Sequence, residues 1–180
     1  VKEAGLDMIP TSSTINQLSL GDALAISTLK KKKINNLDFK KFHPSGSLGE
    51  KLKTAEDLML TKDKIPFIDE NNLMTKALKI MTEKKLGTLI VRNDKKYTTG
   101  IITDGQIRRF NSKNINLNSL KVKNVMTRNP IKIDKNTLAT KALAIMNEKK
   151  ITSLCVYEKK KKLITIGILH IHNILNRKIY

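Results

Sequence analysis

The sequence predicts an α/β protein, most of which is a unit that occurs twice. Thr75–Lys85 (TKALKIMTEKK) and Thr140–Lys150 (TKALAIMNEKK) lie 65 residues apart and differ at two of eleven positions. Each is followed by an aliphatic run, LGTLIV or ITSLCV, and then by a glycine that opens a second aliphatic run. Because a repeat of this length is one supersecondary unit used again, we expect a duplication over residues 54–180, preceded by a segment of another kind.

Each copy has the same predicted order of helix, strand, strand and helix. The first helix of each copy has apolar residues at helical spacing: Leu73, Ala77, Leu78 and Met81, or Leu138, Ala142, Leu143 and Met146. Strands are expected at 88–91 and 98–102, and again at 153–157 and 163–169. Closing helices carry Ile107 and Phe110, or Ile174 and Leu175. Neither copy can close a core alone, so we expect the two to pack through their sheets.

The segment before residue 54 has no counterpart in the repeat. Pro10-Thr11-Ser12-Ser13-Thr14 is typical of a helix N-terminus, where hydroxyl side chains cap backbone N–H groups. The predicted helix continues through several apolar residues and ends in Lys30–Lys33, whose charge suits a helix C-terminus. A short helix around 37–42 leads into the polar stretch HPSGSLG at 43–49.

Composition limits the function classes. The 180 residues carry a net charge of +19, but aromatic residues make up only 4%, too few for a base-stacking platform. Most of the excess is lysine rather than arginine, which argues against specific nucleic-acid recognition. The single Cys155 lies in an apolar run and is interpreted as a small core residue. No apolar run reaches 18 residues, so no membrane span is predicted, and a start at Val1 inside ordered-looking sequence suggests a piece of a longer protein.

The motifs together resemble a known family. The duplicated unit, with Gly100-Ile101-Ile102-Thr103-Asp104-Gly105 after its second strand, resembles a tandem pair of CBS modules, a Bateman module. The front segment resembles the end of the doubly wound sugar isomerase (SIS) domain of arabinose-5-phosphate isomerases. The residues on which this resemblance rests are Glu3-Ala4, Pro10–Thr14, Gly21-Asp22-Ala23-Leu24-Ala25 and His43-Pro44 with Gly46 and Leu48-Gly49. The spacing between Glu3 and Pro10 is one residue shorter than the family pattern, and Ser45 and Ser47 replace its usual Gly and Ala.

The resemblance implies three regions: the end of a SIS domain at 1–53, a first CBS module at 54–115 and a second at 120–180. It implies a cytoplasmic homotetramer that interconverts D-arabinose 5-phosphate and D-ribulose 5-phosphate for lipopolysaccharide synthesis, with the CBS pair as a regulatory or assembly module. It implies no cofactor and no metal. The family's phosphate loop and catalytic lysine are absent from these residues, so this chain alone is expected to be inactive.

The same resemblance assigns roles to residues of the front segment. Aldose–ketose isomerisation needs a base, an acid near the carbonyl oxygen and a phosphate anchor. His43 matches the family's catalytic histidine, and Glu3 matches an acidic residue that either takes the carbon proton or positions the base. Thr11, Ser12 and Ser13 are candidate contacts to the sugar phosphate at a helix N-terminus, and simple helix caps otherwise.

The CBS pair offers a second candidate site, for a nucleotide or a sugar nucleotide. The usual nucleotide fingerprint places an Asp three residues after a Thr or Ser, where the carboxylate accepts hydrogen bonds from both ribose hydroxyls. Here Gln106 follows Thr103-Asp104, and Asn173 follows His170, so both carboxylates are replaced by amides. An amide still forms hydrogen bonds but without the charge. Thr103 and Asp104 could equally be helix caps.

Two alternatives compete with an isomerase. The first is a non-catalytic ligand-sensing or dimerisation module on a SIS scaffold. The second is a CBS-containing nucleic-acid regulator, which the lysine excess permits. A metal site at His170 and His172, which would share one face of a strand, lacks a third ligand at suitable spacing.

Overall fold

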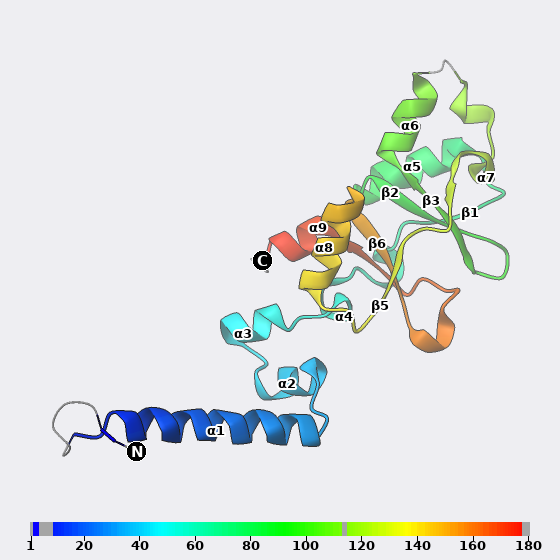
Figure 1. Cartoon of the computed structure of the whole chain (residues 1–180). Coiled ribbons are helices and arrows are strands. Elements are labelled where there is room, and N and C mark those ends of the chain that lie inside the picture. Colours follow the sequence, from blue (N-terminus) through cyan, green and yellow to red (C-terminus); the bar gives the residue numbers. More distant parts are fainter. Residues whose placement is uncertain (1, 4–8, 113–114, 178–180) are drawn as a thin grey trace. The chain divides into compact units, whose positions relative to one another are not determined.

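The computed structural model describes residues 2–3, 9–112 and 115–177. The chain divides into two compact units, Val1–Pro44 and Ser45–Tyr180 (Figure 1). The first unit is helical, and the second is the mixed α/β part that contains the whole duplication. Among the described residues, no helix combines the length and the apolar character that crossing a membrane requires.

The first unit consists of α1 (Ser12–Lys31) and α2 (Asn36–Phe42). The predicted helix N-terminus and lysine-rich C-terminus of α1 are both confirmed. Nothing in α1 is buried, and Ile15, Leu18, Leu20 and Leu24 are all more than half exposed. Leu20 and Leu24 lie on the side of the helix away from Ile15 and Leu18, and a helix that is apolar on more than one face is normally buried in a larger domain.

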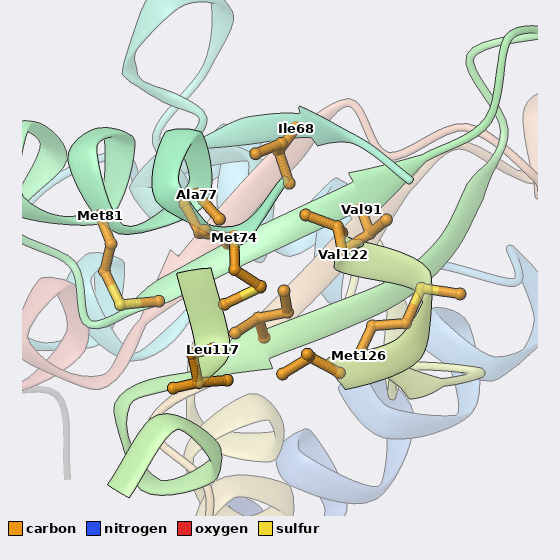
Figure 2. Packing of buried hydrophobic residues seen from close by; sticks show 11 residues of the cluster. Ile68, Met74, Ala77, Met81, Val91, Leu117, Val122 and Met126 are labelled. Carbon is orange, nitrogen blue, oxygen red and sulfur yellow. The ribbon is translucent and has the colours of Figure 1, made fainter. Parts of the chain in front are cut away.

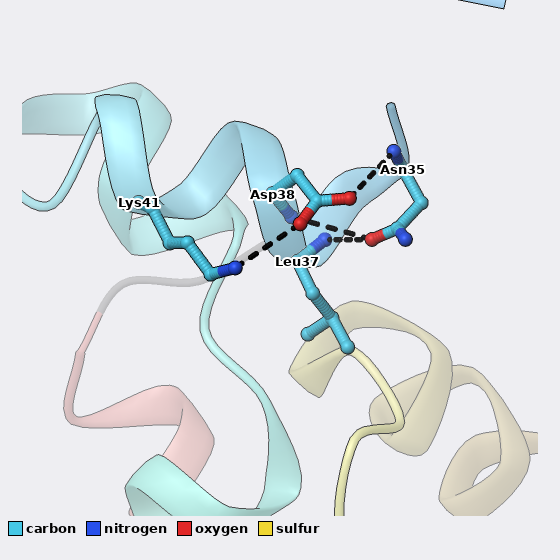
Figure 3. A network of polar contacts seen from close by, with 4 residues as sticks. All are labelled: Asn35, Leu37, Asp38 and Lys41. Carbon is cyan, nitrogen blue, oxygen red and sulfur yellow. Dashed lines mark hydrogen bonds and ion pairs between the residues drawn. The ribbon is translucent and has the colours of Figure 1, made fainter. Parts of the chain in front are cut away.

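Helix α2 is fixed at its N-terminus by a capping box (Figure 3). The side-chain oxygen of Asn35 accepts hydrogen bonds from the backbone N–H groups of Leu37 (2.8 Å) and Asp38 (3.2 Å). The Asp38 carboxylate accepts in return from the Asn35 N–H (3.3 Å) and pairs with Lys41 (3.1 Å). This reciprocal cap sets where the seven-residue helix starts, and so places His43 at its C-terminal end.

The second unit contains two related sheets and the helices that cover them. The first repeat has β1 (Phe67–Asp69), α5 (Met74–Lys84), β2 (Thr88–Arg92), β3 (Thr98–Thr103) and α6 (Asp104–Asn111). The second has β5 (Lys132–Asp134), α8 (Ala139–Lys149), β6 (Ser153–Tyr157), β7 (Gly167–His170) and α9 (Ile171–Leu175). Short elements precede each repeat: α3 (Gly46–Lys51), α4 (Ala55–Leu58) and η1 (Lys62–Lys64), then η2 (Leu117–Ser119), α7 (Val122–Val125) and β4 (Thr127–Arg128). A last 3₁₀ turn, η3 (Lys159–Lys161), lies between β6 and β7.

The predicted order of helix, strand, strand and helix holds in both repeats, but each begins with an additional strand. β1 pairs in parallel with β2, and β5 pairs in parallel with β6. With three residues each, β1 and β5 are too short to show an alternating pattern. The strand expected at 163–169 is also shorter than predicted. Residues 159–166 hold η3 and the connection that follows it, so β7 begins only at Gly167.

Each repeat is completed by the short elements that precede the other one. We call the segment from α3 to η1 the first linker and the segment from η2 to β4 the second linker. In the core of the first repeat, Val122, Val125 and Met126 of the second linker pack with Met74 and Val91 (Figure 2). β4 adds a fourth strand to the same sheet, antiparallel to β3. In the core of the second repeat the corresponding places are filled from the first linker, by Ala55 and Leu58, and Leu60 forms an antiparallel bridge with Ile168.

The two repeats meet through their sheets, as expected. Ile90 of β2, Cys155 of β6 and Ile168 of β7 form one buried cluster together with Ile65. The predicted core position of Cys155 is therefore confirmed. Its side chain is fully buried, and burial raises the pKa of the thiol from 9.0 to about 11.

Buried hydroxyl groups pair residues that occupy equivalent places in the two repeats. Thr98 and Thr165 share a hydrogen bond of 2.7 Å, and the backbone N–H of Thr165 also donates to the Thr98 hydroxyl at 3.2 Å. Thr88 and Ser153 form a longer bond of 3.4 Å. Because each pair joins like to like, the duplicated sequence generates an approximate two-fold relation between the repeats.

Candidate functional site

Glu3 lies at the N-terminal end of α1 and acts as its cap. Its carboxylate accepts hydrogen bonds from the backbone N–H groups of Thr11 (2.7 Å) and Ser13 (3.2 Å) and from the Thr11 hydroxyl (3.1 Å). The Ser13 hydroxyl and these backbone donors stabilise the charged form and lower the pKa of Glu3 from 4.5 to about 2. A carboxylate with so low a pKa is a weak proton acceptor, so this geometry suits a positioning role better than that of carbon base.

The hydroxyl residues were predicted to cap the N-terminus of α1, but the Glu3 carboxylate does so instead. The Thr11 side chain donates to Glu3 and makes no side-chain cap bond to the helix. The carboxylate therefore occupies the anion-binding position at the start of α1. The substrate contacts predicted for Thr11, Ser12 and Ser13 stay a prediction, and a phosphate could reach the Thr11 and Ser13 N–H groups only if Glu3 moved.

His43 is exposed and terminates α2. Its backbone N–H donates to the carbonyl of Phe39 (3.1 Å), and its ring lies against the Phe39 ring at a centroid distance of 4.6 Å. α2 follows the C-terminal end of α1, whereas Glu3 binds the N-terminal end (Figure 1). The two predicted catalytic residues thus come from opposite ends of α1 and do not contact each other in the described structure.

The second candidate site is a cleft of about 750 Å³ at the edge shared by the two repeats. Four of the five predicted CBS residues line it: Thr103, Asp104, Gln106 and His170. The paired hydroxyls of Thr88 and Ser153 also belong to its lining. Because these two residues are equivalent, the cleft lies where the two repeats meet in an approximately symmetric way. Asn173, the fifth predicted residue, is near it in sequence but is not part of the lining.

Gln106 is buried, and all its hydrogen-bonding capacity is used inside the protein. Its amide nitrogen donates to the Thr127 hydroxyl (2.5 Å) and to the Val125 carbonyl (3.3 Å). Its amide oxygen accepts from the backbone N–H (2.9 Å) and the hydroxyl (3.5 Å) of Thr103. A primary amide offers two donors and two acceptor positions, so Gln106 has none left for a ribose. It ties α6 to the segment around β4 instead.

The residue equivalent to Gln106 in the second repeat is Asn173, a neutral amide that already makes one hydrogen bond inside the protein. The side-chain oxygen of Asn173 accepts from the backbone N–H of His170 (3.2 Å). The Nδ1 atom of His170 accepts from the His172 N–H (3.3 Å), and the two rings stack at a centroid distance of 5.1 Å. Burial and, to a smaller extent, the neighbouring His172 lower the pKa of His170 from its usual value. In the part of the chain that the structure describes, no three His, Cys, Asp or Glu side chains gather as a metal site.

The sequence reasoning missed the cations of the cleft. Lys85, Lys150, Arg108 and Arg109 all belong to its lining. The two lysines end the equivalent helices α5 and α8, in the left-handed conformation with φ of 55° and 53°. Their recurrence in both copies was the available signal, hidden by the general excess of lysine.

Comparison with known proteins identifies the second unit. The family model of the CBS domain matches residues 55–113 and 122–179. A crystal structure of an uncharacterized conserved protein from Pyrococcus horikoshii is 24% identical with a TM-score of 0.62, covering 71% of this chain and 92% of that one. A structure of CBSX2 in complex with AMP is 22% identical with a TM-score of 0.61, covering 70% and 96%.

Sequence relatives extend the similarity into the front segment. Arabinose 5-phosphate isomerase KdsD of Yersinia pestis is 38% identical over 171 residues, 94% of this chain and 51% of that protein. The Escherichia coli K12 protein of the same name is 37% identical over the same shares. An uncharacterized Rickettsia prowazekii protein is 35% identical over 97% of this chain and 53% of its own length. The chain thus spans about half the length of the curated relatives it matches.

The duplicated helix–strand–strand–helix order, the cleft between the copies and the family match all agree. The chain belongs to the CBS domain family as a tandem pair, and with its front segment it resembles the C-terminal part of arabinose 5-phosphate isomerases.

Proposed function

We propose that the protein to which these residues belong is a sugar-phosphate isomerase that interconverts D-arabinose 5-phosphate and D-ribulose 5-phosphate. The observation that carries the proposal is the extent of the similarity. The isomerases align with 94% of the chain, whereas the CBS match begins only at residue 55. Most of the first 54 residues therefore lie inside the alignment, and CBS modules alone do not account for it.

The physical state of α1 supports the same proposal. Its apolar side chains point to more than one side and are exposed in the described chain. Leaving Ile15, Leu18, Leu20 and Leu24 in water costs roughly 1.5–3 kcal/mol for each side chain relative to burial. A helix of this kind fits as one layer of a larger domain, which is what the end of a SIS domain would be.

The geometry supports an assignment of roles to His43 and Glu3. His43 is exposed at the end of α2, as a group that must reach a substrate should be, and we assign it proton transfer at a substrate oxygen or in ring opening. Glu3 orders the start of α1 and is assigned a positioning role. Because the two come from opposite ends of α1, an assembled active site would take them from different chains, in agreement with the homotetramer that the resemblance implies.

The CBS pair is proposed to regulate or assemble the enzyme through a ligand in its cleft. AMP is bound by CBSX2, which shares the fold. In this chain α4 packs in the core of the second repeat and follows the front segment directly. A ligand that changes the second repeat would therefore act on the segment that leads to the catalytic region.

The test is isomerase activity of the full-length protein on D-arabinose 5-phosphate, with His43→Ala compared with wild type. Loss of general acid–base catalysis is expected to lower kcat by about 10²–10⁴-fold. Lys41→Ala is the matched control, since it removes only an exposed pair on the same helix and should leave the activity unchanged. A wild-type protein without activity on pentose 5-phosphates would refute the isomerase and favour a non-catalytic ligand-sensing module.

A further inference from the structure

The charged side chains that line the cleft between the repeats are mostly positive. Lys85, Arg108 and Arg109 come from the first repeat, and Lys150 from the second. All four side chains are exposed, and none has an ion-pair partner within the described ranges. Among the described residues that line the cleft, Asp104 is the only carboxylate. Cations that converge on a concave surface without counter-charges attract anions strongly.

One of the two arginines, Arg109, lies close to the backbone at Gly105. A Cβ atom on Gly105 would lie 3.9 Å from both a terminal nitrogen of Arg109 and the Thr103 hydroxyl. The guanidinium of Arg109 therefore folds back over the first turn of α6, close to Thr103. A planar, permanently charged donor group and a hydroxyl thus both approach Gly105, a combination suited to phosphate oxygens.

Recognition of a ribose diol lacks its usual partner on both sides. Gln106 is saturated by Thr103, Thr127 and Val125. Asn173 does not line the cleft and its oxygen caps α9. The Asp104 carboxylate packs against Gly87, which has φ of +60° and would have no room for a Cβ because of that oxygen at 2.6 Å. The charge that the lining offers a ligand is therefore mainly positive.

We infer that the cleft binds a small phosphate-bearing anion through Arg108, Arg109, Lys85 and Lys150, with no requirement for a ribose diol. The inference rests on the proposed function in that it names the ligand class of the regulatory cleft. It also sets this cleft apart from one that selects nucleosides by their sugar hydroxyls. Asp104, the one negative group, opposes such a ligand rather than holding it.

The experiment is calorimetric titration of the full-length protein with AMP, 2′-deoxy-AMP and adenosine at two salt concentrations. AMP and 2′-deoxy-AMP are expected to bind with dissociation constants within threefold of each other. Adenosine, which lacks the phosphate, should bind at least tenfold more weakly. Affinity for both nucleotides should fall as salt rises, since exposed charges are screened.

Variants test which side chains supply the charge that the anion meets. Arg108→Gln/Arg109→Gln and, from the other repeat, Lys150→Gln should each weaken both nucleotides by about tenfold or more, as a lost pair of charge-assisted bonds implies. Asp104→Asn should leave binding unchanged or tighten it. Lys159→Gln/Lys160→Gln is the control, because it removes two charges from η3, outside the cleft, and should have no effect.

Three outcomes would overturn the inference: no binding of either nucleotide, 2′-deoxy-AMP at least tenfold weaker than AMP, or Asp104→Asn at least tenfold weaker than wild type. The same samples are assayed for isomerase activity. Active protein that binds no nucleotide refutes the inference alone. Inactive protein that binds both nucleotides as described refutes the proposed isomerase alone.

Discussion

The two CBS repeats share a framework and differ at their rims. Leu89 and Leu154 are equivalent and fully buried, and the equivalent glycines Gly100 and Gly167 each receive a methionine from the linker. At the cleft, however, the first repeat presents arginines on α6, whereas the second presents two stacked imidazoles. The interior of a duplicated unit is held by packing that tolerates little change, while the rim is free to diverge towards a ligand.

The largest effects are expected in the shared core. Leu89→Ala and Leu154→Ala each remove a fully buried side chain and should lower the free energy of unfolding by about 2–5 kcal/mol. Because the repeats share a buried cluster and exchange their linkers, each variant should speed hydrogen exchange in both β2 and β6. Exchange that rises only in the altered repeat would show that the two are independent units.

The next effect tests the exchanged methionines. A methyl group at Gly100 would meet Met126, including its Cγ at 2.8 Å, and one at Gly167 would meet Met59 at the same distance. Gly100→Ala and Gly167→Ala should each destabilise the second unit by about 1–3 kcal/mol through overpacking. Gly21→Ala is the control, since nothing lies within 4 Å of its added methyl in α1. Equal melting temperatures for all three variants would contradict the packing described.

A smaller effect distinguishes the two hydroxyl pairs. Thr98→Val leaves the Thr165 hydroxyl and N–H without their buried partner and should cost about 1–3 kcal/mol. Thr88→Val removes only the 3.4 Å bond to Ser153 and should cost about 1 kcal/mol or less. Urea denaturation measures both. A larger cost at Thr88 would mean that the cleft side, not the Thr98 side, holds the repeats together.

The smallest expected effect is the chemical reactivity of Cys155, which lies in the buried cluster shared by the two repeats. With a pKa of about 11, the buried thiol is almost wholly protonated at pH 8, and only the thiolate reacts. Native protein should therefore show no measurable reaction with a thiol reagent at pH 8, and full reaction in denaturant. Rapid modification of the native protein would place Cys155 at an accessible surface.

Several features of the fold follow from local patterns that the sequence shows directly. The repeat, its helices α5 and α8 and the strands β2, β3 and β6 were predictable because apolar spacing reports which face of each element is buried. The family's front segment was likewise visible in short motifs around Pro10 and His43. The short strands β1 and β5 were not predictable, since three residues carry no period.

The candidate sites divide in the same way. The residue types at the cleft, with amides in place of carboxylates, are a property of the sequence. That Gln106 has no donor or acceptor left depends on Thr127 and Val125, about 20 residues away. That Glu3 caps α1 depends on the chain returning to Thr11 and Ser13, which no local pattern specifies.

By itself, then, the sequence determined the duplication, the α/β class, the buried Cys155 and the place of the candidate residues along the chain. Only the tertiary structure decided which linker completes which core, and which polar groups are still free to meet a ligand. Periodicity is a local property of consecutive residues, whereas hydrogen-bond saturation and linker exchange depend on partners brought together from distant positions.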